Sequence, residues 1–530
     1  MEFLLTLDDL SPTPLYRQVY DQLRQAILSG RFLPGDRLPS TRALAASLDV
    51  ARITVEQGYE QLAAEGYLES RPGSGRYVAQ PLPDDLLTAA GPSRPQPRPS
   101  RAGARPTSGW AARLMSGESD VAGARGLDDP YERAGPPLTY DFRPGATSRD
   151  AFPASLWRRL LARQWRKEGA ELLAYGDAAG YFPLREAIAS YLQRARGVDC
   201  EAEQVVITGG TTQAVDLLTR LTVDAGDTAI LEDPGFPGAR ALLSAAGARL
   251  LPLPVDDHGL RVESLPPPDQ AGGVRLIYVT PSHQYPLGGT LPLPRRLALL
   301  RWAEAVGAIV VEDDYDSEFR YSGRPVTALQ GLDRAGLVVY IGTFSKVLSP
   351  GLRLGYVVLP PRLLRPFIAA KRLADRHTPA LEQRALADFI LEGHFERHLR
   401  RLRILYRGRQ GVLVEALRRE LAGVCAVEPA AAGMHLVVRL AAGLDEDEVA
   451  RAAAAASVGV HPLSRFRPTL AQGPVLLMGY TGLANDEIAA GVVRLAAALH
   501  SVASGYFHRG QMQPEHDRLP ARGALTAGGG

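Results

Sequence analysis

The segment from residue 80 to residue 137 most constrains the fold, because it divides this 530-residue chain into two stretches of different pattern. It is rich in Pro, Arg, Gly and Ser, as in "GPSRPQPRPSRAGARPTSG", and offers too little apolar surface to build a core. We therefore predict a multidomain protein with a small domain over 1–79, a flexible linker over 80–137 and a large domain over 138–500. The tail over 501–530, which ends in "ALTAGGG", is predicted to be disordered.

The composition excludes several classes of protein. Hydrophobic residues make up 45% of the chain and charged residues 22%, which is ordinary for globular domains. No apolar run approaches the roughly 18 residues that a membrane span needs, and the start "MEFLLTLDDL" lacks the basic residues of a signal peptide. The two cysteines, Cys200 and Cys425, form neither a disulfide framework nor a metal spacing. We expect a cytoplasmic protein without a metal site.

The linker carries five arginines and no acid between Leu86 and Gly117. Such a segment is either a solvated tether or a basic strap that follows phosphates. The pattern leaves both open.

The small domain opens with an amphipathic helix. Thr13 can cap it, Pro14 suits its first turn, and Gly30 suits the left-handed position after its end. Apolar residues recur every four positions and predict one buried stripe: Leu15, Val19, Leu23 and Ile27.

A helix-turn-helix and a wing follow in the sequence. "STRALAASL" predicts a second helix capped by Ser40, "DVA" predicts a tight turn, and "RITVEQGYEQLAAEGYL" predicts a third helix. "YLESRPGSGRYVA" then indicates two short strands around a Gly-rich tip. The small domain is thus predicted to be α+β.

This arrangement resembles the winged helix-turn-helix of the GntR regulators. The resemblance rests on "LPSTRALAASLDVARITVEQGYEQLAAEGYLESRPGSGRYVA" and implies binding to double-stranded DNA. It places Arg52 and Thr54 at the start of the recognition helix and Arg42 on the second helix, while Gly75 lets the wing approach DNA closely. Ser40, in the matched Leu-Pro-Ser, completes the expected DNA-binding set.

Two features weaken this expectation of DNA binding. The family usually has Gly-Val-Ser-Arg at the turn, whereas this chain has Asp49-Val50-Ala51-Arg52, which removes one phosphate contact. Residues 1–79 also hold eight arginines and ten acids, so binding must rest on local basic placement. The alternative is a helical interaction module that no longer touches DNA.

Lys346, in "YIGTFSKVLSPGLRLGY", is one of only three lysines among 60 basic residues. An ε-amine can lose its proton and form a Schiff base, which a guanidinium cannot do. The retained lysine therefore suggests covalent carbonyl chemistry, and its significance depends on a surrounding site for pyridoxal phosphate.

The large domain supplies the other parts of such a site. Short β-branched runs alternate with helical stretches, which predicts an α/β fold. In "AIVVEDDYDSEF", Asp313 follows a buried strand and can hold the pyridine nitrogen, while Tyr315 can bond the phenolic oxygen. Phe236 in "EDPGFPG" is a candidate for ring stacking.

The cofactor phosphate needs amides at a helix start and polar side chains nearby. "ITGGTTQAVDLLTRL" offers the helix start, and the Lys346 segment offers the side chains. The expected phosphate ligands are Gly210, Thr211, Thr212, Thr343, Ser345 and Arg353.

Together these motifs, with "YGDAAGYFPLREAIASYL" and "TPSHQYPLGG", resemble class I aminotransferases of fold type I from about Tyr140 to residue 500. The resemblance implies a homodimer whose site lies at the subunit interface, where Tyr175 reaches the partner's phosphate. A GntR winged helix fused to this domain is the arrangement of the MocR family, some members of which, called PdxR, regulate pyridoxal phosphate synthesis. We therefore predict a regulator that holds pyridoxal phosphate on Lys346 and senses the cofactor or an amino-compound adduct.

The chain departs from the aminotransferase pattern at two places. Tyr285-Pro286-Leu287-Gly288 stands where transaminases commonly have Asn-Pro-Thr-Gly, and "PVLLMGYTGL" lacks the arginine that clamps a substrate carboxylate. Arg465 or Arg467 in "SRFRPT" could substitute, although surface positions are expected for both. A working aminotransferase remains the alternative function, and a scaffold in which Lys346 has no role is a third.

Overall fold

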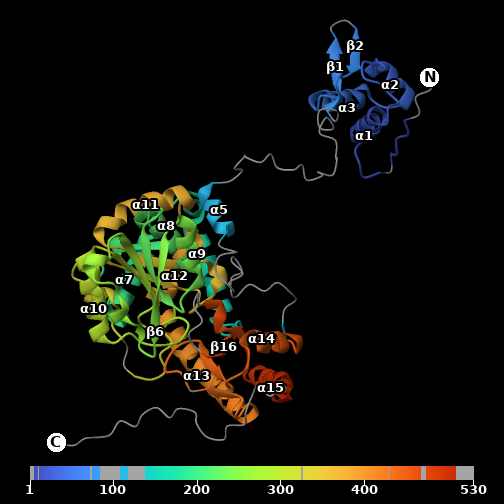
Figure 1. The fold of residues 1–530 in the computed structure, drawn as a ribbon. Coiled ribbons are helices and arrows are strands. Elements are labelled where there is room, and N and C mark those ends of the chain that lie inside the picture. Colours follow the sequence, from blue (N-terminus) through green and yellow to red (C-terminus); the bar gives the residue numbers. More distant parts are fainter. Residues whose placement is uncertain are drawn as a thin grey trace, which may run out of the picture. The chain divides into compact units, whose positions relative to one another are not determined.

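The computed structural model describes residues 5–9, 11–71, 74–83, 108–116, 138–323, 326–427, 429–466 and 473–508. The chain forms two compact units, Met1–Pro106 and Thr107–Gly530, which are described separately (Figure 1).

The small unit is a three-helix bundle with a two-stranded wing. Its elements are α1 (Leu15–Leu28), α2 (Thr41–Leu48), α3 (Arg52–Ala64), β1 (Leu68–Arg71) and β2 (Gly75–Val78). The strands β1 and β2 pair antiparallel. Val19, Leu23 and Ile27 are buried as predicted, and Leu15 is half-buried.

The helix limits of the small unit agree with the sequence at Ser40, in the turn before α3 and at Gly30, which follows α1 with φ +74°, and they differ at Thr13. The Ser40 hydroxyl caps α2 by accepting the Ala43 N–H at 3.1 Å, and Asp49 adopts the left-handed conformation in the turn before α3. Thr13, however, does not cap α1. Pro14 takes that position, because its own carbonyl accepts the first helical N–H groups, those of Arg17 and Gln18.

The large unit is built on an eight-stranded sheet of order β4-β11-β10-β9-β8-β5-β6-β7. All neighbours from β10 to β6 pair parallel, whereas β11 runs antiparallel to β10 and β4, and β7 antiparallel to β6. The strands are β4 (Val205–Thr208), β5 (Thr228–Asp233), β6 (Arg249–Asp256), β7 (Gly259–Leu260), β8 (Val274–Val279), β9 (Ile309–Asp314), β10 (Val338–Thr343) and β11 (Gly355–Val358).

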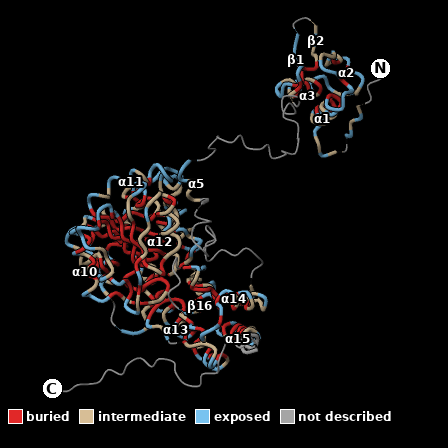
Figure 2. Tube along the Cα trace, viewed as in Figure 1, coloured by how far each residue is buried: buried red, intermediate tan, exposed pale blue. Residues whose placement is uncertain are grey.

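Helices cover this sheet, so that the strands β4, β9, β10 and β11 are buried throughout (Figure 2), whereas β6 is partly exposed. The apolar runs "VGAIVVEDD" and "LVVYIGT" form the neighbouring buried strands β9 and β10, as predicted. The helices of this part are α6 (Ala154–Glu168), α7 (Phe182–Arg196), α8 (Thr211–Thr222), α9 (Pro237–Ala246), α10 (Leu293–Val306), α11 (Pro361–Asp375) and α12 (Ala380–Leu391).

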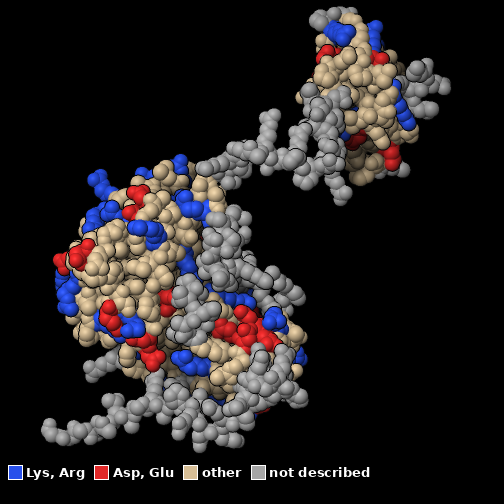
Figure 3. All heavy atoms as spheres, viewed as in Figure 1, with Lys and Arg blue, Asp and Glu red and all other residues tan. Residues whose placement is uncertain are grey.

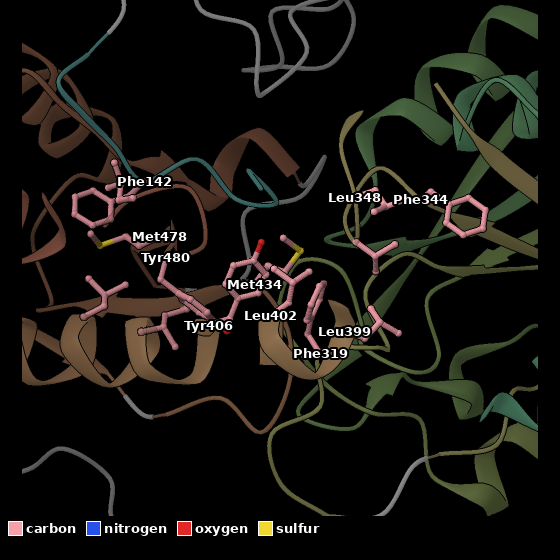
Figure 4. Packing of buried hydrophobic residues seen from close by; sticks show 14 of the residues in the cluster. Phe142, Phe319, Phe344, Leu348, Leu399, Leu402, Tyr406, Met434, Met478 and Tyr480 are labelled. Carbon is pink, nitrogen blue, oxygen red and sulfur yellow. The ribbon is translucent and has the colours of Figure 1, made fainter. Parts of the chain in front are cut away.

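The C-terminal part of the large unit adds a second sheet of order β12-β13-β16-β15. Its long helix α13 (His394–Glu420) carries Leu399, Leu402 and Tyr406 into the main core, where they meet Met434 and Tyr480 (Figure 4). The remaining elements are β3 (Tyr140–Asp141), β12 (Cys425–Val427), β13 (His435–Leu440), α14 (Glu446–Ala455), β14 (Val458–Gly459), β15 (His461–Pro462), β16 (Val475–Gly479) and α15 (Asn485–His508).

Part of the predicted linker is helical. Residues Gly109–Ser116 form a helix, α5, in which Arg113 donates to the carbonyls of Ala245 at 2.9 Å and Ala246 at 3.3 Å, at the end of α9. The helix formers in "GWAARLM" stand among Pro and Arg residues that obscure their pattern. The linker prediction is therefore corrected at α5, while residues 84–107 and 117–137 lie outside the described residues.

The predicted tail also begins too early, because α15 continues to His508. The apolar pattern of "RLAAALHSVASGYFH" sustains the helix beyond residue 500. Residues 509–530 lie outside the described residues. Of the helices in the described ranges, none combines the length and apolar character needed to cross a membrane.

Candidate cofactor and DNA-binding sites

Lys346 follows β10 in a segment that is anchored on both sides. Phe344 and Leu348 are buried in the core with Leu399 of α13 (Figure 4), while Lys346 itself is half-buried. Its Nζ donates to the Gly145 carbonyl at 3.2 Å. Gly145 has φ +72°, and a Cβ there would lie 2.5 Å from that Nζ. The absence of a side chain at Gly145 thus makes room for the lysine head.

Asp313 lies near the carboxyl end of β9, beside Ile341 of β10. Its Oδ2 accepts a hydrogen bond from the Tyr278 hydroxyl, while its buried Oδ1 has no hydrogen-bond partner among the described residues. Burial raises the pKa of this carboxyl to about 7, against the opposing effects of Tyr278 and Lys346. A buried acceptor without a donor is costly, so Oδ1 fits a ring N–H.

Tyr315, the second predicted cofactor ligand of this segment, is held by a polar pair. Its hydroxyl lies 2.9 Å from His283 Nδ1, and the same nitrogen lies 2.9 Å from Asp316 Oδ2. His283 and Asp316 are both buried. The Tyr315 hydroxyl is therefore fixed in place.

The predicted phosphate residues meet at the start of α8. Gly210 is its N-cap, with φ +117°, and a Cβ there would lie 3.3 Å from the Arg353 guanidinium. Thr211 and Thr212 are the first residues of α8, so their N–H groups have no partner within the helix and point out of its N-terminal end, where Gly210 and Arg353 meet. A helix start beside a guanidinium fits an anion such as phosphate.

Thr343 and Ser345 lie near the start of α8 because β10 pairs with β11, which packs against Gly210. Thr343 pairs with Gly355 across β10 and β11, and a Cβ on Gly355 would lie 2.9 Å from Gly210 Cα. The Ser345 N–H donates to Thr343 Oγ1 at 3.1 Å. All six predicted phosphate residues are therefore contiguous.

Phe236 is the N-cap residue of α9. Its ring stacks on Tyr278, with centroids 6.3 Å apart and an interplanar angle of 23°. Because Tyr278 also bonds Asp313, Phe236 belongs to the same edge of the sheet.

Two predicted residues, Tyr175 and Arg465, stand apart from this cluster. Tyr175 is 82% exposed and lies against His377 and Arg376. Arg465 is exposed, and Arg467 lies outside the described residues.

In the small unit, four of the five predicted DNA-binding residues are exposed, namely Ser40, Arg42, Arg52 and Gly75. Thr54 is half-buried. Arg52 forms an ion pair with Glu56 at 2.7 Å, so a DNA phosphate must compete with that carboxylate. Basic and acidic side chains are interspersed on the face of this unit that is in view (Figure 3), consistent with local rather than bulk basic charge.

Sequence reasoning missed four residues at these sites. Gly145, Tyr278 and His283 contact the predicted cofactor residues, and Ile53 is 59% exposed beside Arg52 on α3. His283 stood in the quoted motif "TPSHQYPLGG", and Ile53 is an apolar residue on the face predicted to meet DNA. The sequence carries no local signal for Gly145 or Tyr278, which reach the site only through tertiary structure.

Comparison with known families agrees with both units. The family described as "Aminotransferase class I and II" matches residues 149–475, and "Bacterial regulatory proteins, gntR family" matches residues 15–78. Among solved structures, the α-aminoadipate aminotransferase LysN from Thermus thermophilus aligns with a TM-score of 0.65 and 30% identity, over 75% of this chain and 98% of that one.

Regulatory proteins match this chain over nearly their whole length. The chain is 42% identical to "Probable rhizopine catabolism regulatory protein MocR" of Rhizobium meliloti, over 94% of this chain and 97% of the relative. It is 32% identical to the pyridoxine biosynthesis regulator PdxR of Corynebacterium glutamicum, over 87% and 91%. The protein is a DNA-binding transcriptional regulator with an aminotransferase-like domain. It belongs to the MocR family.

Proposed function

We propose that this regulator holds pyridoxal phosphate at Lys346 and that the occupied site changes how its small unit binds operator DNA. When bound, the cofactor supplies an electrophilic carbonyl carbon and a ring that withdraws electrons. The observation that carries the proposal is the unpartnered Oδ1 of Asp313, a buried acceptor at the sheet edge that also holds Lys346.

Different residues of the chain would bind different parts of the cofactor. Asp313 would accept the N–H of the ring nitrogen at its unpartnered Oδ1, and the negative charge of the ionised carboxylate would keep that nitrogen protonated. Tyr315, fixed by His283, would bond the phenolic oxygen. Arg353 and the first amides of α8 would bind the phosphate, and Phe236 would cover the ring.

Lys346 would provide the amine that attaches the cofactor. Its N–H donates to the Gly145 carbonyl, which fixes the position of the nitrogen. The role of nucleophile requires the neutral amine.

Regulation requires that a ligand bind two states of the protein unequally. We infer that the occupied and empty forms of the large unit differ in how they present the DNA-binding units of a homodimer. The high exposure of Tyr175 supports this arrangement, since an aromatic side chain left in solvent is available to a partner subunit.

A working aminotransferase is the second candidate. The chain is 34% identical to the 2-aminoadipate transaminase of Thermus thermophilus over 68% of its length, and the lysine and aspartate geometry suits the same cofactor. Steady turnover of an amine and a keto acid would favour this function, whereas a sensor would stop after one half-reaction.

The test is the near-visible absorption of purified protein with added pyridoxal phosphate, with wild type beside Lys346→Ala. We expect a band in wild type that survives dialysis and is absent from the variant. Operator binding by wild type should change on loading, and binding by the variant should not. A stable band of equal intensity in both proteins would contradict attachment at Lys346.

A further inference from the structure

A cluster of apolar and aromatic residues, which we term the Tyr285 cluster, adjoins the cofactor residues Phe236 and Tyr315. Its buried members are Tyr285, Leu463, Phe466, Val475 and Leu477. The Tyr285 ring meets Tyr315, Phe466 and Phe236 edge to face, with centroid distances of 5.4, 5.6 and 6.2 Å.

Tyr285 carries an unsatisfied polar atom into this cluster. The side chain is 6% exposed, and its buried hydroxyl has no hydrogen-bond partner among the described residues. A buried hydroxyl without a partner is energetically costly. A ligand group that bonded it would recover that energy.

The Tyr285 cluster contains no positive charge among its described members. His435, 5.9 Å from the Tyr285 ring, has its pKa lowered to about 4 by burial and is neutral at pH 7. The Arg240 guanidinium donates to the Phe466 carbonyl at 2.7 Å and also interacts with the carboxylate of Asp233. The carboxylate of Asp316 adds negative charge near the site, since its Oδ2 lies 2.9 Å from His283 Nδ1.

Strand β16 presents only apolar side chains to the Tyr285 cluster. Its residues alternate, so that Val475 and Leu477 pack in the Tyr285 cluster while Leu476 and Met478 pack in the main core. Leu477 is fully buried. The described members of the cluster offer no cation to pair with a ligand carboxylate placed here, and desolvation without a counter-ion is strongly unfavourable.

We propose that the effector site beside Lys346 selects a primary amine that has a hydroxyl or similar polar group but no carboxylate, with the Tyr285 hydroxyl as its hydrogen-bond partner. The inference rests on the proposed function, because it assigns the ligand class of the same site. The ligand amine would face Lys346, and its polar group would enter the Tyr285 cluster.

Three small probes test this assignment. Ethanolamine carries an amine and a hydroxyl, serine adds a carboxylate to it, and propylamine replaces the hydroxyl with a methyl group. Calorimetric titration of protein that shows the cofactor band should give at least tenfold tighter binding of ethanolamine than of serine. Equal or tighter binding of serine, or no binding of ethanolamine up to about 50 mM, a limit that corresponds to about 2 kcal/mol, would overturn the inference.

Two variants separate the parts of the site. Tyr285→Phe should weaken ethanolamine about fivefold and leave propylamine unchanged, since it removes one neutral hydrogen bond. Leu477→Arg should bring serine to within about threefold of ethanolamine by supplying the missing cation. If that buried substitution prevents folding, the Tyr285→Phe result still decides, because an unchanged affinity for ethanolamine contradicts the role of Tyr285.

The same titration distinguishes the two levels of the proposal. A protein that never acquires the cofactor band contradicts the proposed function and the inference with it. A protein that acquires the band but binds serine as tightly as ethanolamine retains the proposed function and loses only the ligand class.

Discussion

The two units of this regulator place their functional residues in opposite environments. In the small unit the predicted DNA-binding residues come from the stretch 40–75, and most are exposed. In the large unit the residues of the candidate cofactor site come from segments between Gly145 and Gly355, and several lie inside the core. Function and stability should therefore separate by mutation in the small unit, and they should change together in the large one.

The largest effect is expected from Gly145→Ala. The new Cβ would lie 2.5 Å from Lys346 Nζ, at a φ of +72° that also strains any non-glycine residue. We expect affinity for pyridoxal phosphate to fall at least 100-fold, about 2.7 kcal/mol, as measured by loss of the absorption band on dilution.

The matched control is Gly226→Ala, at φ +96° with no atom within 4 Å of its Cβ. It carries similar backbone strain but should retain the cofactor. Equal losses in the two variants would show that strain alone, and not displacement of Lys346, causes the effect.

Asp313→Asn should change the dependence of stability on pH. Burial raises the pKa of Asp313 from 3.8 to about 7, so the folded protein keeps a proton that the unfolded chain releases between these values. The free energy of unfolding of the cofactor-free protein therefore falls as pH rises through this window. The variant lacks this loss and should gain stability relative to wild type, by up to roughly 4 kcal/mol above pH 7.

Urea unfolding of both proteins at pH 4, 5.5 and 7.5 measures that difference. The difference in free energy of unfolding between the variant and wild type should grow with pH. The variant should also bind pyridoxal phosphate more weakly. A constant gap across the series would mean that Asp313 titrates at its ordinary pKa.

The contrast between the units also explains what the sequence predicted. The winged helix was recognisable because caps, turns and contacts are local, as with Ser40 and Asp49. The sequence could predict that Lys346 and Asp313 share one region of the fold, because strand ends of a parallel sheet share one edge; their role in binding a cofactor stays a prediction. Tyr278 could not be predicted from the sequence, because its contact with Asp313 spans 35 residues and depends on the order of the strands in the sheet.

The same limit applies to the segments outside the two domains. The helix α5 was missed because its docking depends on carbonyls 132 and 133 residues away. Local composition averages over such a short helix and cannot show the partner that stabilises it.

Ile53→Ala tests the small unit at an exposed position. Ile53 is 59% exposed at the start of α3, where an apolar side chain can contact a thymine methyl group. We expect operator affinity to fall about fivefold, or about 1 kcal/mol, with an unchanged melting temperature. Leu33→Ala, at a residue that is 61% exposed and outside the recognition helix, should change neither quantity. A large fall in melting temperature for Ile53→Ala would break the contrast between the units.

The smallest functional effect is expected from Arg113→Ala, at the junction between the predicted linker and the large unit. The substitution removes the guanidinium that donates to both carbonyls at the end of α9. We expect amide exchange of Gly109–Ser116 to accelerate about fivefold, as the loss of one net hydrogen bond implies. Cofactor affinity should stay unchanged, because Arg113 bonds the end of α9 whereas Lys346 bonds the Gly145 carbonyl.

Arg220→Ala, which removes an exposed ion pair with Asp216 on α8, is the control for loss of a surface arginine. It should leave amide exchange of α5 unchanged. If α5 exchanges no faster in Arg113→Ala than in this control, apolar packing and not the Arg113 hydrogen bonds holds α5 on the large unit. A fall in cofactor affinity in Arg113→Ala alone would instead couple α5 to the Lys346 site, and the large unit would then sense its own junction with the linker.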